Sequence, residues 1–265
     1  MVKAAEKKRS PLIIQMFPWA VTFSSGLLVY AAAQAAKSAS VPVAIHLDHA
    51  QDEALIKQAA ELPFDSIMVD MSHYEMDENL RKTAGLVKYC NDRKITTEAE
   101  PGRIEGGEDG VADTFDLTSS LTTEKQVEDF IDTGVDFLAP AFGNVHGEYG
   151  TRGPVLEFDR YVFNSGWREA CLPDNRLEMI RQKVRNRVRI VLHGTNDFTE
   201  SIMKKCITGG ISKVNVNKLV LEDYLQHLKA NASILPLTTL MEQGVDKVQK
   251  LMEWQMDVCG STGKA

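Results

Sequence analysis

Three histidines in this 265-residue chain each follow a short apolar run. They are His49 in Val-Ala-Ile-His-Leu-Asp-His, His146 in Ala-Phe-Gly-Asn-Val-His-Gly, and His193 in Arg-Ile-Val-Leu-His-Gly. Neutral imidazole is a common zinc ligand, and three protein ligands leave one coordination position open for a substrate. Asp48 places a carboxylate beside the first histidine. These residue types therefore predict an open zinc site with a group for proton transfer next to it.

A glycine follows two of the histidines, Gly147 and Gly194. Glycine at such a position lets backbone N–H groups approach an anion closely. A single histidine at the end of a strand is more often structural, and the segment from His46 to His49 could serve only to cap the next helix. Two His-Gly pairs together with the Asp-His pair favour the metal site. The other histidines, at 46, 73 and 227, are not assigned to metal.

The segment from Glu98 to Gly110 is rich in glycine and acidic residues. Glu108 and Asp109 lie among three of its glycines, which suggests a mobile loop. A carboxylate on such a loop suits proton abstraction after a substrate closes the site. The alternative is a solvated acidic loop without a chemical role.

The segment from Thr208 to Lys218 is predicted to be a short strand that leads into a helix. Backbone N–H groups at the start of that helix could bind a phosphate together with Asn215, Asn217 and Lys218. Asn217 could also be a simple helix N-cap, and both roles are compatible.

Apolar runs that resemble buried strands recur along the chain and alternate with helical patterns. The expected strands cover 12–15, 41–47, 66–70, 95–99, 135–141, 188–192 and 212–216. The expected helices cover 51–62, 75–90, 123–133, 174–184, 198–207, 218–230 and 238–258. Strand–helix alternation predicts a parallel sheet that can close as a (β/α)8 TIM barrel, with all of 1–265 in one domain. The carboxyl ends of its strands would bring the three histidines to one mouth.

The expected strands number seven rather than eight. Residues 1–8 read as the end of a helix, so the first strand of a closed barrel is expected before residue 1. A net charge of −7 argues against nucleic-acid or anionic-membrane partners, because both require a basic surface. The four cysteines are widely separated and no signal peptide is visible, which favours a cytoplasmic protein.

The chain resembles the class II, zinc-dependent fructose-bisphosphate and tagatose-bisphosphate aldolases from about residue 10 to its end. The resemblance is carried by five segments: His46-Leu-Asp-His49, Glu98-Ala-Glu100 with the loop to Gly110, the stretch from Thr133 through Gly143-Asn-Val-His-Gly147, Leu192-His-Gly194, and Lys213-Val-Asn215. It implies a barrel enzyme of glycolysis that is a homodimer or larger. Its implied reaction is the reversible cleavage of a ketose 1,6-bisphosphate to dihydroxyacetone phosphate and glyceraldehyde 3-phosphate. Fructose and tagatose bisphosphates differ at one stereocentre, and the sequence does not choose between them.

The resemblance also implies a role for each site residue. Zinc would bind His49, His146 and His193, with Glu100 as an alternate contact. Asp48 would handle the proton at the aldehyde-derived oxygen, and Glu108 the proton on the carbon beside the ketone. The phosphate, often with a sodium or potassium ion, would lie at Gly147, Gly194, Asn196, Asn215, Asn217 and Lys218.

Some positions depart from the family pattern. After the third histidine, the segment Thr195-Asn-Asp197 has an amide where the family has a small hydroxyl residue, and a carboxylate where the family has a glycine. Lys218 replaces a threonine, and Phe17 replaces a serine or threonine. These changes leave two alternatives to an active aldolase. One is a catalytically weak zinc-binding paralogue with an altered phosphate pocket and a binding or regulatory role, and the weaker one is an unrelated zinc hydrolase.

Overall fold

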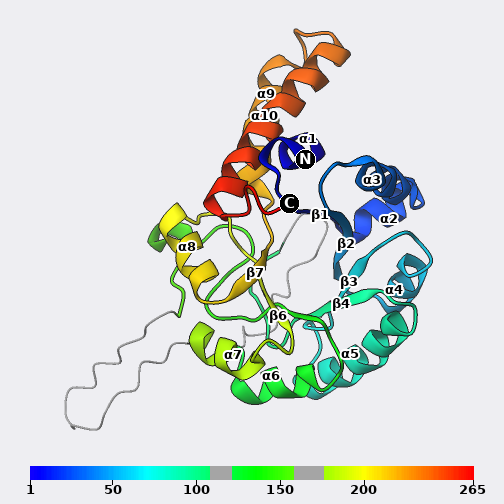
Figure 1. The fold of residues 1–265 in the computed structure, drawn as a ribbon, viewed down its shortest axis with the longest axis vertical. Coiled ribbons are helices and arrows are strands. Elements are labelled where there is room, and N and C mark those ends of the chain that lie inside the picture. The colour runs from blue at the N-terminus through cyan, green and yellow to red at the C-terminus, as the bar shows by residue number, and fades with distance from the viewer. Residues whose placement is uncertain (108–120, 158–175) are drawn as a thin grey trace, which may run out of the picture.

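A seven-stranded parallel sheet forms the centre of the molecule. The fold was obtained as a computed structural model that describes residues 1–107, 121–157 and 176–265. Within these ranges the strands follow one another in chain order, from β1 to β7, and curve into a barrel-like ring (Figure 1). They are β1 (Leu12–Met16), β2 (Val43–Ala50), β3 (Ser66–Val69), β4 (Thr96–Ala99), β5 (Phe137–Leu138), β6 (Arg189–Leu192) and β7 (Ile211–Val214). The predicted parallel α/β barrel architecture is confirmed, although β5 is shorter than expected.

Helices surround the outer face of this sheet. They are α1 (Val2–Lys8), α2 (Pro18–Ser24), α3 (Leu27–Ser38), α4 (Glu53–Ala59), α5 (Met76–Asn91), α6 (Glu124–Ile131), α7 (Arg176–Val184), α8 (Glu200–Thr208), α9 (Lys218–Asn231) and α10 (Leu237–Val258), with a 3-10 turn at Gly150–Arg152. The sequence patterns missed α2 and α3. The segment from 26 to 36 is almost uniformly apolar or small, so it shows no contrast between a buried and an exposed face.

Each strand divides its side chains between two environments, because successive residues point to opposite faces. Ile45 and Leu47 of β2 and Ile67 of β3 point outward and join the main apolar core beneath the helices. The inward positions include a small apolar cluster of Met68, Ala139 and Val191. They also carry several buried polar groups, namely His46, Asp48, Glu98 and Lys213. A polar layer therefore lies inside the ring.

The end of β2 contains a bulge that matters for the site. Strict alternation would point His49 away from Asp48, on the face that Leu47 occupies. The pairing of β2 with β3 shifts between Leu47 and Ala50, and His49 has a φ of 47°, in the left-handed region. The bulge re-aims the side chain, so that Asp48 and His49 both face the barrel mouth. The simple capping role is wrong, because Asp52 caps α4 by accepting from the Leu55 N–H at 2.8 Å.

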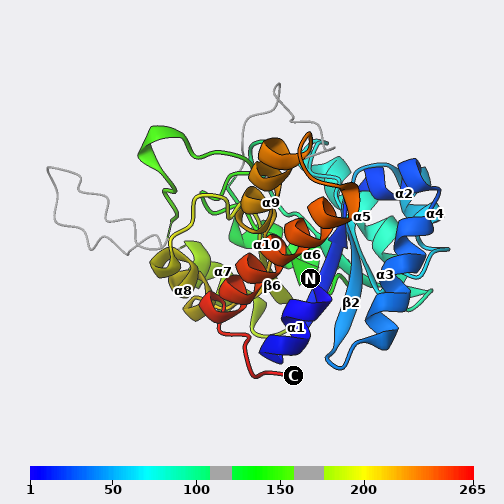
Figure 2. The ribbon, with the colours of Figure 1, turned by 90° about the horizontal axis from the view of Figure 1, so that it is seen from above.

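The two ends of the chain lie together. Helix α1 packs beside the long helix α10, and the C-terminus lies near the end of α1 (Figures 1 and 2). The Gly263 N–H donates to the Lys8 carbonyl at 2.9 Å, and Lys7 pairs with Glu253 at 2.7 Å. Helices α9 and α10 extend from the barrel as an arm (Figure 1). No helix in the described ranges has the length and hydropathy needed to cross a membrane.

Candidate metal and proton-transfer site

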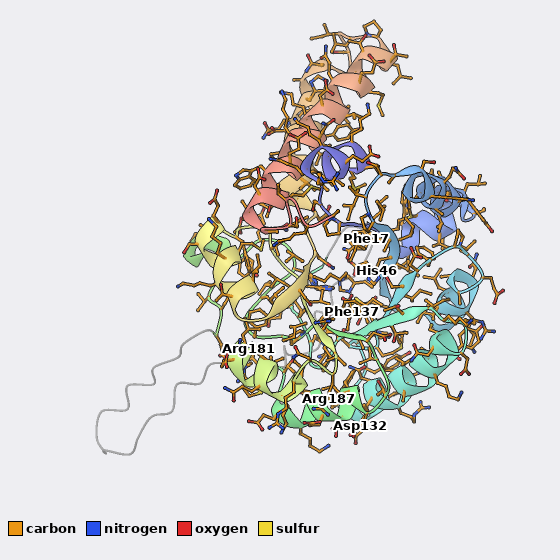
Figure 3. All side chains as sticks on the ribbon, in the orientation of Figure 1. Phe17, His46, Asp132, Phe137, Arg181 and Arg187 are labelled. Carbon is orange, nitrogen blue, oxygen red and sulfur yellow. The ribbon has the colours of Figure 1, made fainter. Side chains whose placement is uncertain are left out.

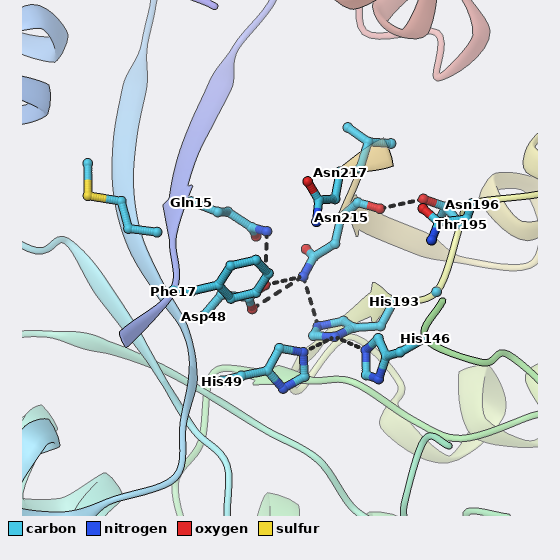
Figure 4. Close-up of a pocket in the computed structure, with 13 residues that line it drawn as sticks. Gln15, Phe17, Asp48, His49, His146, His193, Thr195, Asn196, Asn215 and Asn217 are labelled. Carbon is cyan, nitrogen blue, oxygen red and sulfur yellow. Dashed lines mark hydrogen bonds between the residues drawn. The ribbon is translucent and has the colours of Figure 1, made fainter. Parts of the chain in front are cut away.

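The three predicted histidines converge at the mouth of the barrel. His193 Nδ1 lies 3.1 Å from His49 Nε2 and 3.2 Å from His146 Nε2 (Figure 4). All three side chains are buried. Zinc bonded tetrahedrally to imidazole nitrogens at about 2.0–2.1 Å holds those nitrogens about 3.3 Å apart. The arrangement therefore fits a zinc ion on three imidazoles.

Carboxylates hold the far nitrogens of two of these rings. His49 Nδ1 lies 2.8 Å from Asp70 Oδ2, and His193 Nε2 lies 2.9 Å from Glu98 Oε1. A ring that donates its outer N–H to a carboxylate keeps its other nitrogen unprotonated and correctly aimed for a metal. The two contacts orient His49 Nε2 and His193 Nδ1 toward the same point.

The charge state of the histidines is set by their buried neighbours. Burial lowers the pKa of His146 well below its usual value, and the nearby His49 and His193 lower it further. This keeps His146 a neutral ligand. Burial alone would lower the pKa of His49, but Asp48 and the hydrogen-bonded Asp70 outweigh it and raise that pKa to about 10. Metal binding at His49 must therefore displace a proton, as is usual when a metal and a proton compete for one nitrogen.

Asp48 sits beside the histidine cluster and is held by amide donors. Asn215 Nδ2 lies 3.1 Å from Asp48 Oδ2, and Gln15 Nε2 lies 3.2 Å from the same oxygen (Figure 4). Burial would raise the pKa of Asp48, but His49, His46, His193 and Lys213 together hold it well below its usual value. The carboxylate is therefore ionised, which a proton acceptor requires.

The other predicted proton-transfer residue, Glu108, lies outside the described residues. The chain that leads to it is placed, since the Glu105 carbonyl accepts from the His146 N–H at 2.7 Å. The base of this loop is thus attached directly to the segment that carries the second histidine.

Most of the predicted phosphate residues meet on one side of the cavity, whose volume is about 80 Å³. Gly194, Asn196, Asn215 and Asn217 line it. Gly147 joins them because its carbonyl accepts from Asn196 Nδ2 at 2.9 Å. Asn217 occupies the N-cap position of α9, as expected for one of its two suggested roles, but its side chain forms no helix-cap hydrogen bond there.

Lys218 is placed differently from the rest of this group. It is exposed at the start of α9 and pairs with Glu148 Oε1 at 2.7 Å. Asp197, which the sequence suggested would oppose an anion, accepts from the Tyr149 N–H at 3.0 Å. Both charged side chains therefore tie the segment around residue 148 to its neighbours.

Gly194 is required by close contact between two chain segments. Its φ is 68°, and a Cβ atom there would lie 2.3 Å from the Val145 carbonyl oxygen. The segments that carry His146 and His193 can approach each other only because residue 194 has no side chain. The second His-Gly pair thus brings His146 and His193 together, in addition to any role with an anion.

Glu100 lies next to the Asp70–His49 pair and is fully buried. One carboxyl oxygen accepts from the Ile104 N–H at 2.7 Å, while Oε2 has no hydrogen-bond partner among the described residues. Burial and the neighbouring Asp70 raise the pKa of Glu100 to about 8, against the opposing effect of His49. Glu100 is therefore protonated at neutral pH when no metal is bound.

A pH dependence of stability follows for the metal-free protein. The folded-state pKa of Glu100 is raised above its ordinary value of 4.5. Glu100 therefore adds most to the free energy of unfolding below pH 4.5, and this contribution is lost as the pH rises toward 8. Urea unfolding in excess chelator at pH 5.5 and pH 8 should show a steeper loss in wild type than in Glu100→Gln. His49 contributes a loss of the same sign to both proteins. Glu100→Gln also removes one of the charges that raise the pKa of His49, so both effects make the loss smaller in the variant.

The sequence patterns did not identify Asp70, Glu98, Gln15 or Lys213 as partners in this site. Asp70 follows the last apolar residue of β3, a position that signals a site only when a histidine of β2 is known to lie opposite. Glu98 and Lys213 are charged residues inside short predicted strands, and both are buried in the structure. A charged residue at a position expected to be buried was the signal that the sequence offered.

Comparisons with known proteins agree with this geometry. Residues 1–264 match the family model described as "Fructose-bisphosphate aldolase class-II". A protein of Coccidioides immitis (strain RS) named "Putative fructose-bisphosphate aldolase" is 50% identical over 273 residues, which cover 100% of this chain and 85% of that protein. The "Fructose-bisphosphate aldolase" of Streptococcus pyogenes serotype M3 (strain ATCC BAA-595 / MGAS315) is 31% identical over 282 residues, covering 100% of this chain and 89% of that protein.

A crystal structure of the aldolase-like protein from Coccidioides immitis superposes with a TM-score of 0.92 at 51% identity. The match covers 99% of this chain and 87% of that one. The match to the family over nearly the whole chain removes the unrelated zinc hydrolase as an alternative. Together with the barrel fold, it shows that this chain belongs to the class II fructose-bisphosphate aldolase family, a family of carbon–carbon lyases.

Proposed function

We propose that this protein is a zinc-dependent aldolase that cleaves fructose 1,6-bisphosphate to dihydroxyacetone phosphate and glyceraldehyde 3-phosphate. The observation that supports it best is the convergence of three histidines, with the ionised Asp48 beside them. His49 Nε2 and His146 Nε2 lie 3.1 and 3.2 Å from His193 Nδ1. A carbon–carbon bond beside a ketone breaks only if the electron pair left behind is stabilised. Zinc held by the three imidazoles would polarise the ketone and so supply that stabilisation.

The proton transfers are assigned to two carboxylates. In the cleavage direction Asp48 accepts the proton of the C4 hydroxyl as the C3–C4 bond breaks and the aldehyde forms. Gln15 and Asn215 hold this carboxylate in place through the 3.2 and 3.1 Å contacts. Glu108 then supplies a proton to C3 of the three-carbon product, which leaves as dihydroxyacetone phosphate. General acid–base groups of this kind contribute roughly 10²–10⁴-fold to a rate.

The phosphate next to the ketone is assigned to the side of the cavity formed by Gly147, Gly194, Asn196, Asn215 and Asn217. Lys218 would add positive charge after its pair with Glu148 opens. A sodium or potassium ion would bind the carbonyls of the same loops. Glu100 would serve as an alternate zinc contact, since its unpartnered oxygen belongs to a cluster with His49 and Asp70.

We propose a homodimer or larger oligomer in the cytoplasm, working in glycolysis. The arm of α9 and α10 supports an oligomer, because it exposes Leu225, Leu237, Met241 and Val245. Exposed apolar side chains gathered on one element are typical of protein interfaces. The cysteines at 90 and 206 are buried and free, as is usual in a reducing compartment.

The proposal predicts turnover that depends on bound metal. Purified protein loaded with zinc should release dihydroxyacetone phosphate from fructose 1,6-bisphosphate in a coupled assay. EDTA should abolish the release, and added zinc should restore it. A parallel assay with tagatose 1,6-bisphosphate shows which configuration at C4 the enzyme prefers. Absence of chelator-sensitive turnover on both ketose bisphosphates would reject the proposal.

A second candidate is a zinc-binding relative with weak catalysis and a regulatory role. It is favoured by the Lys218–Glu148 ion pair and by the hydrogen bond of Asn196 to Gly147, which occupy two predicted phosphate contacts. Calorimetry with dihydroxyacetone phosphate separates the two candidates. Zinc uptake without affinity for this triose phosphate supports the second candidate, and binding of the triose phosphate supports the aldolase.

A further inference from the structure

A closed ring of buried polar side chains lies inside the barrel, below the three converging histidines. Lys213 Nζ contacts Glu98 Oε2 at 2.8 Å and Asn215 Oδ1 at 2.9 Å. Asn215 Nδ2 reaches Asp48, and Glu98 Oε1 reaches His193. His46 closes the ring between Asp48 and Glu98. This ring joins the proton-transfer carboxylate to the carboxylate that orients a zinc-ligand candidate.

His46 is the least explained member of this ring. Its side chain is only 1% exposed, and Figure 3 labels it beside β2, the strand that carries it. Its Nδ1 lies 2.7 Å from Ser66 Oγ, whereas its Nε2 has no hydrogen-bond partner among the described residues. That nitrogen instead lies 3.6 Å from Asp48 Oδ1 and 3.6 Å from Glu98 Oε2.

The surroundings determine which nitrogen of His46 carries the proton. A serine hydroxyl can donate to Nδ1, but a carboxylate can only accept from Nε2. An unprotonated Nε2 would direct its lone pair toward two acceptor groups in a low-dielectric interior, which is unfavourable. The neutral ring therefore carries its proton on Nε2, which faces both carboxylates.

We infer that His46 is a positioning residue. Its Nε2–H is shared between Asp48 and Glu98 and fixes the positions of both carboxylates relative to each other. Through Asp48 it would align the group that accepts the C4 hydroxyl proton. Through Glu98 it would orient His193 toward zinc. This inference rests on the proton-transfer role proposed above for Asp48.

The same three side chains could be suspected of holding a second metal ion, since His46, Asp48 and Glu98 cluster closely. The Lys213 ammonium group argues against it. It lies 2.8 Å from Glu98 Oε2 and already supplies the positive charge that this buried carboxylate needs. A cation placed between His46 and Glu98 would meet this ammonium group at close range, and their repulsion in a buried setting is large.

Two substitutions of His46 separate the roles of its two nitrogens. In His46→Gln the side-chain nitrogen can occupy the place of Nε2 and still donate to the carboxylates. In His46→Asn the amide group reaches only the place of Nδ1, where its oxygen can accept from the Ser66 hydroxyl, and the contact with the carboxylates is lost. We expect His46→Asn to lower kcat by about 10–100-fold and to weaken zinc binding by about 10-fold, the range typical of partners of metal ligands. His46→Gln should restore both to within about 3-fold of wild type.

Equal losses in the two variants, or wild-type behaviour of His46→Asn, would overturn the inference. Addition of Asp48→Ala provides a further check on kcat. If His46 acts through Asp48, His46→Asn should cost much less in the Asp48→Ala background than in wild type. The same fold-loss in both backgrounds would show that His46 does not act through Asp48.

A measurement on the unaltered protein covers the case in which a variant fails to fold. Nitrogen-15 NMR of histidine-labelled wild type should show His46 with its proton on Nε2, and a proton on Nδ1 would refute the inference. The readouts also separate two kinds of failure. Wild-type protein that binds zinc but cleaves no ketose bisphosphate rejects the proposed function, while the zinc affinities and the NMR result still decide the role of His46.

Discussion

Replacement of His146 by alanine is expected to abolish both zinc binding and aldol cleavage. The ring nitrogen of His146 lies 3.2 Å from His193 Nδ1 and completes the set of three imidazole donors. Two imidazoles cannot hold zinc in the open three-ligand geometry on which catalysis depends. The zinc content of purified protein should fall from about one equivalent to near zero, and turnover should fall to background.

His227→Ala provides a matched control for this loss. His227 lies on α9 and hydrogen-bonds with Asn231, away from the cluster. Loss of this histidine should leave zinc content and kcat near their wild-type values. Full zinc occupancy in His146→Ala would mean that the metal binds elsewhere, and the three-histidine site would then be wrong.

Replacement of Asp48 by alanine is expected to separate metal binding from chemistry. Its carboxylate accepts hydrogen bonds from Gln15 and Asn215 and is not one of the three converging donors. Zinc should therefore remain bound, while kcat falls by roughly 10²–10⁴-fold, the usual contribution of a general acid–base group. Zinc content and steady-state kinetics measured on the same preparation check both halves of this expectation.

Asp52→Ala tests whether the loss is specific to this carboxylate. Asp52 is an exposed aspartate four residues along the chain, and it caps α4 through the Leu55 N–H. Loss of this cap should reduce the free energy of unfolding by about 1 kcal/mol and leave kcat near wild type. An Asp48→Ala enzyme that retains most of its kcat would remove Asp48 from the proposed mechanism.

The architecture and the candidate metal ligands were predictable from the amino-acid sequence. Alternating strand and helix patterns predicted seven parallel strands, and all seven are present in the described part of the chain. The signal was strong because buried parallel strands are continuous apolar runs, each followed by the helix that crosses back. The three histidines were also identifiable, because each lies at or just beyond the end of such a run.

The way in which these side chains contact one another followed from the three-dimensional structure. The left-handed backbone of His49 turns its ring to the barrel mouth, the side that Asp48 also faces, and no short-range pattern predicts a bulge at that position. Asp70, Glu98, Lys213 and His46 became part of the site because they come from different strands whose inward faces meet. The sequence specifies which residues face inward along each strand. The distances between strands depend on register and closure, which the packing of the whole barrel sets.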